Sequence, residues 1–495
     1  MDTLKNRMLC LAAGLMATAC VSGPDQTYTL RQKTLSEVEN NLSVDCGTLD
    51  RDYTDYDAYK EYLEPLGMRM IRLQAGWAKC EKEKGVYTFA WLDHIIDDAV
   101  SRGLQPWLEL SYGNPIYEGG GTPFLSGGWP SSPEAVQAWL AWAKELVTRY
   151  KGKVHDWEIW NEPDLHIRRN GGDPCEIARL AYTTAQLIKQ VDPEATVAAF
   201  GIAAPRKTAA VEPMIAEMAR LIHEGDDPRI IDWVSYHGYH YIPEESYFQD
   251  ADSLSLMLER CGWDVAIWQG ECGAPSEGHM GGALSKYDWT EVSQAKYALR
   301  KMLNDHAHGI RTSIFAMSDM NYASTDAIKT KNRKGLLMTD DNRQVIRPKL
   351  AYSACRNLVS IFDNLDEIQD SSRVTICPAP YDAPDTWPDD AYHYGSAETL
   401  KPIVHLFSEK ESGLETLVYW RGGAAPVAGT DKDLTDISIR HFRCKRPVII
   451  DLVSGEVRRI KGRKRCTVFE GLPYYDAPFV LCDASLIEFS DGPAS

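Results

Sequence analysis

Two glutamates close short apolar segments and carry the functional group that acid–base and nucleophilic chemistry require. Glu162 follows the run at residues 157–161 and precedes Pro163, which stops a strand. Glu271 closes a second run, residues 265–270, and lies 109 positions later. Hydrolysis of a glycosidic bond needs a proton donor for the leaving oxygen and a second carboxylate facing the anomeric carbon. Two strand-end carboxylates meet that need.

Side chains next to Glu162 suit the role of a general acid. A general acid must hold its proton until it reacts, so we expect a raised pKa for Glu162. His237 follows another apolar run and could either tune Glu162 or bind substrate. Asn161 directly precedes Glu162 and could hold the hydroxyl next to the reacting carbon, a bond that tightens in the transition state.

Other side chains suit an ionised Glu271. Tyr239 could donate its hydroxyl proton to Glu271, and Arg72, at the end of an earlier strand, could pair with it. Both interactions favour the carboxylate and would lower its pKa. Glu158 is expected to point to the other side of its strand from Trp157, Ile159 and Asn161, in a structural role.

The elements that must position these residues alternate between strand and helix. Apolar residues at helical spacing predict helices in stretches such as 90–102, 133–150, 175–191, 211–224 and 289–306. Because these helices alternate with the strands, the strands are expected to form a parallel sheet. Eight strand–helix units within residues 40–363 match a closed (β/α)₈ TIM barrel. The alternative is an open doubly wound sheet, but the glycine-rich turn that such a sheet carries after its first strand is missing from this sequence. The candidate strands are 42–47, 68–75, 105–111, 154–161, 195–201, 231–237, 265–270 and 312–318.

Two further regions frame the predicted barrel. The long segment 112–133, rich in glycine and aromatic residues, is either a functional loop or a structural cap over the barrel mouth. Short β-rich segments separated by turn residues follow residue 366, and they predict a smaller C-terminal antiparallel β-sandwich over 366–495.

The N-terminus has the pattern of a signal for export. Lys5 and Arg7 precede a short apolar stretch and small residues, which predicts a signal peptide at residues 1–19. Cys20 follows at once and could carry a lipid, so a lipoprotein in the periplasm or outer membrane and a simply secreted protein both stay open. The sequence contains no Cys-x-x-Cys spacing, so it does not indicate a zinc site. Because an exported protein can form disulfides, we expect at most one or two of them.

The composition narrows the partners. A formal net charge of −18 argues against nucleic acid, which binds clustered Lys and Arg, whereas a neutral carbohydrate is indifferent to it. The 14 Trp and 24 Tyr fit such a ligand because flat aromatic faces stack on sugar rings. We expect no metal and no organic cofactor, since carboxylates suffice for the chemistry.

Several motifs together resemble a known enzyme family. The run at residues 157–163, with His237-Gly238-Tyr239 and Trp268-Gln269-Gly270-Glu271 downstream, is similar to clan A retaining glycoside hydrolases, and most similar to family 39, the β-xylosidase and α-L-iduronidase family. Segments 85–93, 112–115, 335–337 and 348–352 extend the resemblance over roughly residues 40–360. The resemblance implies Glu162 as acid/base, Glu271 as nucleophile and a covalent glycosyl-enzyme.

Further candidate substrate-binding residues are Trp77, Tyr112, Asn114 and Trp268. Phe315 stands where the clan usually carries a tryptophan that forms a wall of the sugar subsite. A smaller wall could mean a sugar other than xylose.

The sequence therefore predicts an exported retaining glycoside hydrolase that works by double displacement, with exo action favoured by the long loop. The alternatives are an endo-acting glycanase of another clan A family and a non-catalytic carbohydrate-binding barrel. The sugar, its linkage and the oligomeric state are not predicted.

Overall fold

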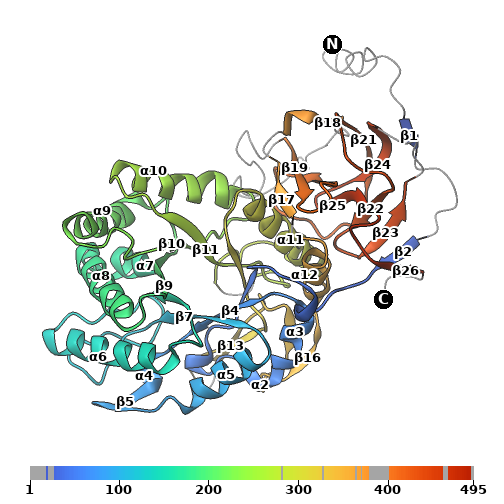
Figure 1. The fold of residues 1–495 in the computed structure, drawn as a ribbon. Helices are drawn as coiled ribbons and strands as arrows, with labels where there is room; N and C mark the ends of the chain where they lie inside the picture. The colour runs from blue at the N-terminus through green and yellow to red at the C-terminus, as the bar shows by residue number, and fades with distance from the viewer. Residues whose placement is uncertain are drawn as a thin grey trace.

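Eight parallel strands close into a barrel at the centre of the larger domain (Figure 1). The computed structural model describes residues 18–20, 27–279, 282–325, 328–362, 365–368, 371–377, 401–460 and 467–491. Each predicted strand is present, usually shortened at one or both ends. In chain order the barrel strands are β3 (Ser43–Asp45), β4 (Met70–Gln74), β7 (Gln105–Leu110), β8 (Asp156–Ile159), β9 (Thr196–Ile202), β10 (Trp233–Tyr236), β11 (Ala266–Cys272) and β12 (Thr312–Phe315).

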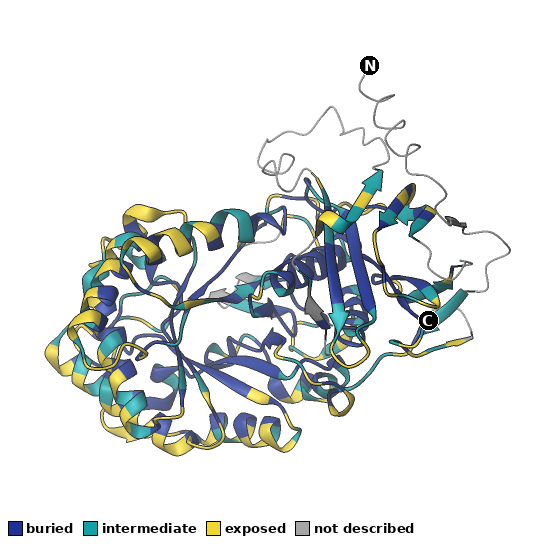
Figure 2. Cartoon of the chain, turned by 45° about the horizontal axis from the view of Figure 1, so that its top comes forward, coloured by how far each residue is buried: buried dark blue, intermediate teal, exposed yellow. Residues whose placement is uncertain are grey.

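Helices surround the barrel and keep their buried faces toward it (Figure 2). Their starts follow from the sequence: Ser132 and Asp173 accept hydrogen bonds from the first turns of α6 and α8, each of which opens with proline. The predicted TIM barrel is confirmed. The longer helices are α5 (Ala90–Ser101), α6 (Pro133–Tyr150), α8 (Pro174–Val191), α9 (Thr208–Glu224), α10 (Asp252–Arg260), α11 (Glu291–Ala307) and α12 (Leu350–Val359), with short helices α2 (Tyr56–Tyr59), α3 (Leu63–Leu66), α4 (Trp77–Cys80) and α7 (Pro163–Asn170).

The end of β8 corrects one prediction about side-chain direction. Trp157 and Ile159 pack into the main apolar core, whereas Glu158 bonds Arg72 inside the barrel. The sequence pattern predicts that Asn161 shares the side of Trp157 and Ile159, but its side chain also bonds Arg72. Trp160 adopts φ 71°, which interrupts the two-residue alternation and turns Asn161 inward.

Two hairpins follow the eighth strand and were not predicted. The first pairs β13 (Met320–Thr325) with β14 (Ile328–Asn332), and the second pairs β15 (Leu337–Thr339) with β16 (Val345–Pro348). A third small pair, β5 (Glu81–Glu83) with β6 (Val86–Tyr87), precedes α5. The first two hairpins lengthen the connection between β12 and α12 and so add residues at the barrel mouth.

The second domain is built from two sheets, as the predicted β-sandwich requires. The larger sheet has the order β17 (Leu365–Glu367), β19 (Pro402–Glu409), β20 (Glu415–Arg421), β25 (Phe479–Asp483), β22 (Pro447–Asp451), β23 (Glu456–Arg459), β2 (Thr27–Leu30) and β26 (Phe489–Asp491). The smaller sheet has the order β1 (Thr18–Cys20), β24 (Val468–Tyr474), β21 (Asp433–Ile439) and β18 (Val374–Cys377). Strand β2 lies before the barrel in the sequence yet pairs with β23 and β26, so the chain enters the barrel from the sandwich.

The N-terminal prediction is largely beyond what the structure describes. Residues 1–17 of the predicted signal peptide lie outside the described residues, and Thr18–Cys20 pair in parallel with Val468–Glu470. Export, lipidation of Cys20 and the domain boundaries therefore stay predictions. No helix in the described ranges has the length and apolar character needed to cross a membrane.

A buried ion pair joins the two domains. Glu244, in the loop after β10, accepts two hydrogen bonds from the Arg300 guanidinium of α11, each at 2.7 Å. The indole of Trp420 on β20 donates to the same carboxylate at 2.7 Å, and Arg300 donates to the carbonyl of Ala424 at 3.0 Å. Glu244, Arg300 and Trp420 are fully buried, so this network fixes the sandwich against the barrel.

We expect Glu244→Gln to lower the free energy of unfolding by about 3–5 kcal/mol, because it leaves the Arg300 charge buried without a counter-charge. The exposed pair Arg220–Glu224 supplies the control, and Glu224→Gln should cost less than about 1 kcal/mol. Urea unfolding of both variants measures the difference. Equal, small losses would show that the buried pair does not stabilise the interface.

Candidate active site

A cavity opens at the carboxyl ends of the barrel strands, where TIM-barrel active sites lie. Its volume is about 280 Å³. Both predicted catalytic glutamates line it, together with side chains from the strand ends, from the long loop after β7 and from the β13 hairpin. The lining residues are Asp45, Gly47, Thr48, Arg51, Tyr53, Arg72, Gln74, Tyr112, Phe124, Leu125, Asn161, Glu162, Glu271, Phe315 and Tyr322.

The two glutamates face each other across this cavity. Glu162 follows β8 with φ 51°, and Pro163 starts α7 directly after it. The Glu162 amide donates to the carbonyl of Gly201 at 3.0 Å, which fixes the turn. Glu271 lies within β11, and one oxygen of each carboxylate lies within 4.8 Å of the other. This short separation leaves room for one acetal linkage between them.

His237 lies between the two glutamates and is fully buried. Its Nδ1 lies 3.0 Å from Glu162 Oε1 and 3.8 Å from Glu271 Oε2. Burial alone would lower the pKa of His237, but the charge of Glu271 and the hydrogen bond with Glu162 raise it to about 9. Burial raises the pKa of Glu162, and the His237 contact only partly opposes that shift.

Glu271 is surrounded by donors. Tyr239 donates its hydroxyl to Oε1 at 2.7 Å, and Arg72 Nη1 donates to Oε2 at 3.2 Å, as the sequence predicted. Burial would raise the pKa of Glu271, but the charges of His237 and Arg72 and the Tyr239 hydrogen bond lower it overall. The two carboxylates therefore have pKa values shifted in opposite directions.

Arg72 connects Glu271 to the rest of the barrel. It donates to Asp45 Oδ2 at 2.8 Å and to Glu158 Oε2 at 2.8 Å, and it contacts Glu109. Every one of these side chains is buried to nine-tenths or more except Glu271, whose side chain is 13% exposed. Acidic groups on four strands thus share one cation.

Asn161, Tyr112 and Phe315 form part of the cavity wall. Asn161 accepts a hydrogen bond from Arg72 Nη2 at 3.0 Å and donates to the Tyr112 hydroxyl at 2.7 Å. The amide is thereby held in one orientation beside Glu162. Phe315, at the end of β12, packs with Ala316 and Met320.

Sequence reasoning missed several residues of the cavity. Arg51 stacks between the rings of Tyr53 and Tyr112, with its guanidinium carbon 5.3 Å and 4.9 Å from their centroids. Tyr322 of the unpredicted hairpin packs edge-on against Tyr53 at 5.0 Å. Phe124 is exposed at the rim although it is apolar. The cluster Arg51-x-Tyr53 after the first strand was the one signal available.

Five predicted substrate-binding residues are not among those that line the cavity. His237 and Tyr239 contact the two glutamates, whereas the other three have structural partners. Trp77 is fully buried and stacks on Tyr117 and Trp142 in the core behind the strands. Asn114 donates to the carbonyl of Glu81 at 2.8 Å and so holds the loop. Trp268 stacks on Trp107 at 4.0 Å deep in the barrel interior. Their aromatic or amide character serves packing and loop structure here.

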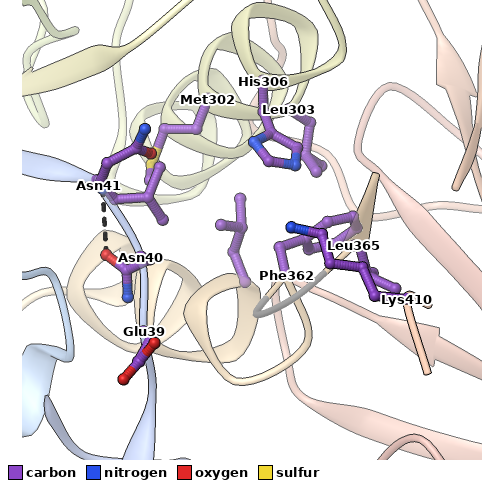
Figure 3. Close-up of a pocket in the computed structure, with 11 residues that line it drawn as sticks. Glu39, Asn40, Asn41, Met302, Leu303, His306, Phe362, Leu365 and Lys410 are labelled. Atoms are coloured by element: carbon purple, nitrogen blue, oxygen red, sulfur yellow. Dashed lines mark hydrogen bonds between the residues drawn. The ribbon is translucent and has the colours of Figure 1, made fainter. Parts of the chain in front are cut away.

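A second pocket, of about 360 Å³, lies at the opposite end of the barrel beside the sandwich (Figure 3). It is lined by Asn41 and Leu42 before β3, by Met302 and His306 of α11 and by Phe362. Its walls are largely apolar and carry no pair of facing carboxylates. It is therefore not the candidate active site.

The group Glu162, His237 and Glu271 also has the spacing of a metal site within the described residues. Several of its possible ligand atoms already have partners, because Arg72 and Tyr239 donate to Glu271 and His237 Nδ1 bonds Glu162 Oε1. The Arg72 charge at 3.2 Å would repel a cation bound there. The arrangement suits paired carboxylates better than a metal.

Comparison with known proteins agrees with this geometry. Residues 59–255 match the family described as "Glycosyl hydrolases family 39". This part of the chain, about two fifths of its length, is similar to the glycosyl hydrolases of family 39. The resemblance inferred from the motifs is confirmed, and the match spans the barrel from before β4 to beyond β10.

Similar proteins include a "Beta-xylosidase" of Caldicellulosiruptor saccharolyticus, 29% identical over 217 residues, or 41% of this chain. The chain matches only 42% of that relative's length. A family 39 glycoside hydrolase from Bacteroides cellulosilyticus shares the fold with a TM-score of 0.59 at 16% identity, covering 92% of this chain and 83% of its own. A monomeric β-xylosidase from Caulobacter crescentus has a TM-score of 0.56 at 14% identity, over 94% and 98% of the two chains.

We expect His237 to titrate near pH 9, well above an ordinary histidine. In Glu271→Gln its pKa should fall, because the charge that most strongly favours the imidazolium is removed. NMR of protein carrying ¹³C-labelled histidine measures both values, with His237→Asn to assign the signal. Titration of His237 near or below pH 6.5 in the unmodified protein would contradict this electrostatic arrangement.

Proposed function

We propose that the protein is a retaining glycoside hydrolase that cleaves a glycosidic bond in oligo- or polysaccharide by double displacement. The observation that carries the proposal is the pair Glu162 and Glu271, which face one cavity within 4.8 Å and have oppositely shifted pKa values. Pairs of titratable groups with separated pKa values mark an acid and a base. The short spacing favours the retaining route over the inverting one, in which a water needs more room.

In the first step Glu162 donates its proton to the leaving oxygen while Glu271 attacks the anomeric carbon. The raised pKa of Glu162 favours the protonated acid, and the lowered pKa of Glu271 favours the ionised nucleophile. Asn161, held by Arg72 and Tyr112, is placed to bind the hydroxyl next to the reacting carbon.

In the second step Glu162, now a carboxylate, takes a proton from water, and the water oxygen replaces Glu271 at the anomeric carbon. His237 assists both steps because it contacts Glu162 and carries positive charge near both carboxylates. Arg72 and Tyr239 stabilise Glu271 when it leaves as a carboxylate. No metal or organic cofactor takes part in this scheme.

The site geometry supports a reaction type more specifically than it supports a particular sugar. The relatives are named β-xylosidases, which makes β-xylosides the first substrates to test. Phe315 and Tyr322 of the β13 hairpin line this cavity, so glycosides of other sugars belong in the same test. The loop after β7 contributes Phe124 and Leu125 to the cavity, which favours exo action over endo action. A non-catalytic carbohydrate-binding barrel would be expected to have lost the two carboxylates. Both are present, which favours an enzyme.

Replacing the proton donor should affect substrates unequally. We expect Glu162→Gln to lower kcat/KM on a glycoside with a poor leaving group by about 10²–10⁴-fold and to spare a 2,4-dinitrophenyl glycoside, which needs little protonation. A panel of aryl glycosides of common sugars measures this and identifies the sugar. Glu176→Gln, in α8, is the matched control. Equal losses on every substrate would contradict the acid/base role of Glu162.

Removing the nucleophile should allow an external one to act. We expect Glu271→Gly to be almost inactive on the 2,4-dinitrophenyl glycoside and to recover activity with added azide. The product should be a glycosyl azide of inverted anomeric configuration, because azide attacks the face that Glu271 would have occupied. NMR of the product reports its configuration. Rescue that yields the retained azide would argue against Glu271 as nucleophile.

A further inference from the structure

Lys334 is a buried cation beside the two glutamates, and the proposed steps give it no role. It lies between β14 and β15, and only 3% of its surface is exposed. Its Nζ forms no hydrogen bond or ion pair with any of the residues that the structure describes. A buried charge costs free energy unless other groups compensate it, so its surroundings indicate its role.

The nearest compensating group is the ring of Tyr239. Lys334 Nζ lies 4.3 Å from the ring centroid, within the range of a cation–π interaction. The hydroxyl of the same ring donates to Glu271 Oε1 at 2.7 Å. A cation on the ring face withdraws electron density from the phenol and makes its O–H a stronger donor. Lys334 is therefore connected to Glu271 through a single side chain.

The backbone around Lys334 is held at this place. Gln294 of α11 donates Nε2 to the carbonyls of Lys334 and Gly335, each at 3.2 Å. The amide of Ala316 donates to the Lys334 carbonyl at 3.2 Å. A Cβ on residue 335 would lie 2.1 Å from the amide nitrogen of Asp319, so only glycine fits. The backbone position from which the Lys334 side chain starts thus follows from the fold.

The titratable groups facing Lys334 are acidic or neutral. Glu271 and Cys272 come from β11, Glu162 follows β8, and Tyr239 follows β10. Burial lowers the pKa of Lys334, and the neighbouring anions limit that fall to about 8, so the side chain is mainly charged at neutral pH. Burial raises the pKa of Cys272 to about 12, which keeps its thiol neutral. The carboxylates are therefore the groups that its charge acts on.

We propose that Lys334 is a positioning residue for Glu271 and that its charge, acting partly through Tyr239, stabilises the carboxylate whenever Glu271 is free of the sugar. The inference rests on the proposed function. In the second step the bond between the anomeric carbon and a Glu271 oxygen breaks, and its electron pair stays on that oxygen. The water oxygen bonds to the carbon, and Glu162 accepts the water proton. Negative charge grows on Glu271 in this step, so a fixed cation nearby lowers the barrier.

The test compares Lys334→Met and Lys334→Arg on the 2,4-dinitrophenyl glycoside that the wild type hydrolyses fastest. Loss of the charge should lower kcat about tenfold through slower release of the sugar from Glu271. KM should fall by a similar factor, and a burst of dinitrophenol should precede the steady state because the covalent intermediate accumulates. The acid limb of kcat/KM should move up by about one pH unit. Lys334→Arg should retain most of the wild-type behaviour.

Lys331→Met is the matched control, because Lys331 lies three residues away in β14 and pairs with the exposed Asp341. A rise in KM at unchanged kcat would overturn the proposal, since it would mean that the ammonium group binds the sugar. An unmoved acid limb, or the same changes in Lys331→Met, would overturn it too. If Lys334→Met does not fold, Lys334→Gln carries the same comparison. A wild type that hydrolyses no glycoside contradicts the proposed function, whereas an active wild type matched by Lys334→Met contradicts only the role of Lys334.

Discussion

One buried guanidinium makes the crowding of carboxylates at the barrel mouth possible. Arg72 contacts Asp45, Glu109, Glu158 and Glu271, which come from strands β3, β7, β8 and β11. In a medium of low dielectric these acids would repel one another strongly, and each would tend to take up a proton. A planar group with five donors can serve several acceptors at once, which a lysine could not do in the same geometry. The barrel brings the acids together, and Arg72 makes that arrangement stable.

Arg72 contacts Glu271 and does not contact Glu162, which helps to shift the pKa values of these two glutamates in opposite directions. Glu271 has a donor on each oxygen, Tyr239 on one and Arg72 on the other. Glu162 lies beyond Arg72, and its side-chain partner among the described residues is His237. Burial therefore dominates the pKa of Glu162 and raises it, whereas hydrogen bonds and charges prevail at Glu271. Two identical side chains a few ångströms apart thus have pKa values shifted in opposite directions because their partners differ.

The sequence predicts the parts of this structure that follow from periodicity and from strand ends. The eight barrel strands, the carboxylates at the ends of two of them and the contacts of Tyr239 and His237 were all available from such patterns. Aromatic residue type did not identify the substrate-binding residues well, because aromatic side chains also fill the apolar core. Trp77 and Trp268 are both buried there. Side chains from irregular segments were missed as well. Tyr322 enters the site from a hairpin whose position depends on contacts distant in sequence.

The boundary of the family match bears on what can be transferred from relatives. The match ends at residue 255, so it includes Glu162 and His237 but stops before β11 and β12. Glu271, Phe315 and Lys334 all lie beyond it. The matched part therefore carries the acid side of the proposed chemistry, and the rest of the site comes from segments outside the match. Phe315 of the cavity wall and Lys334 behind Glu271 both come from those segments, so the family match by itself does not identify the sugar.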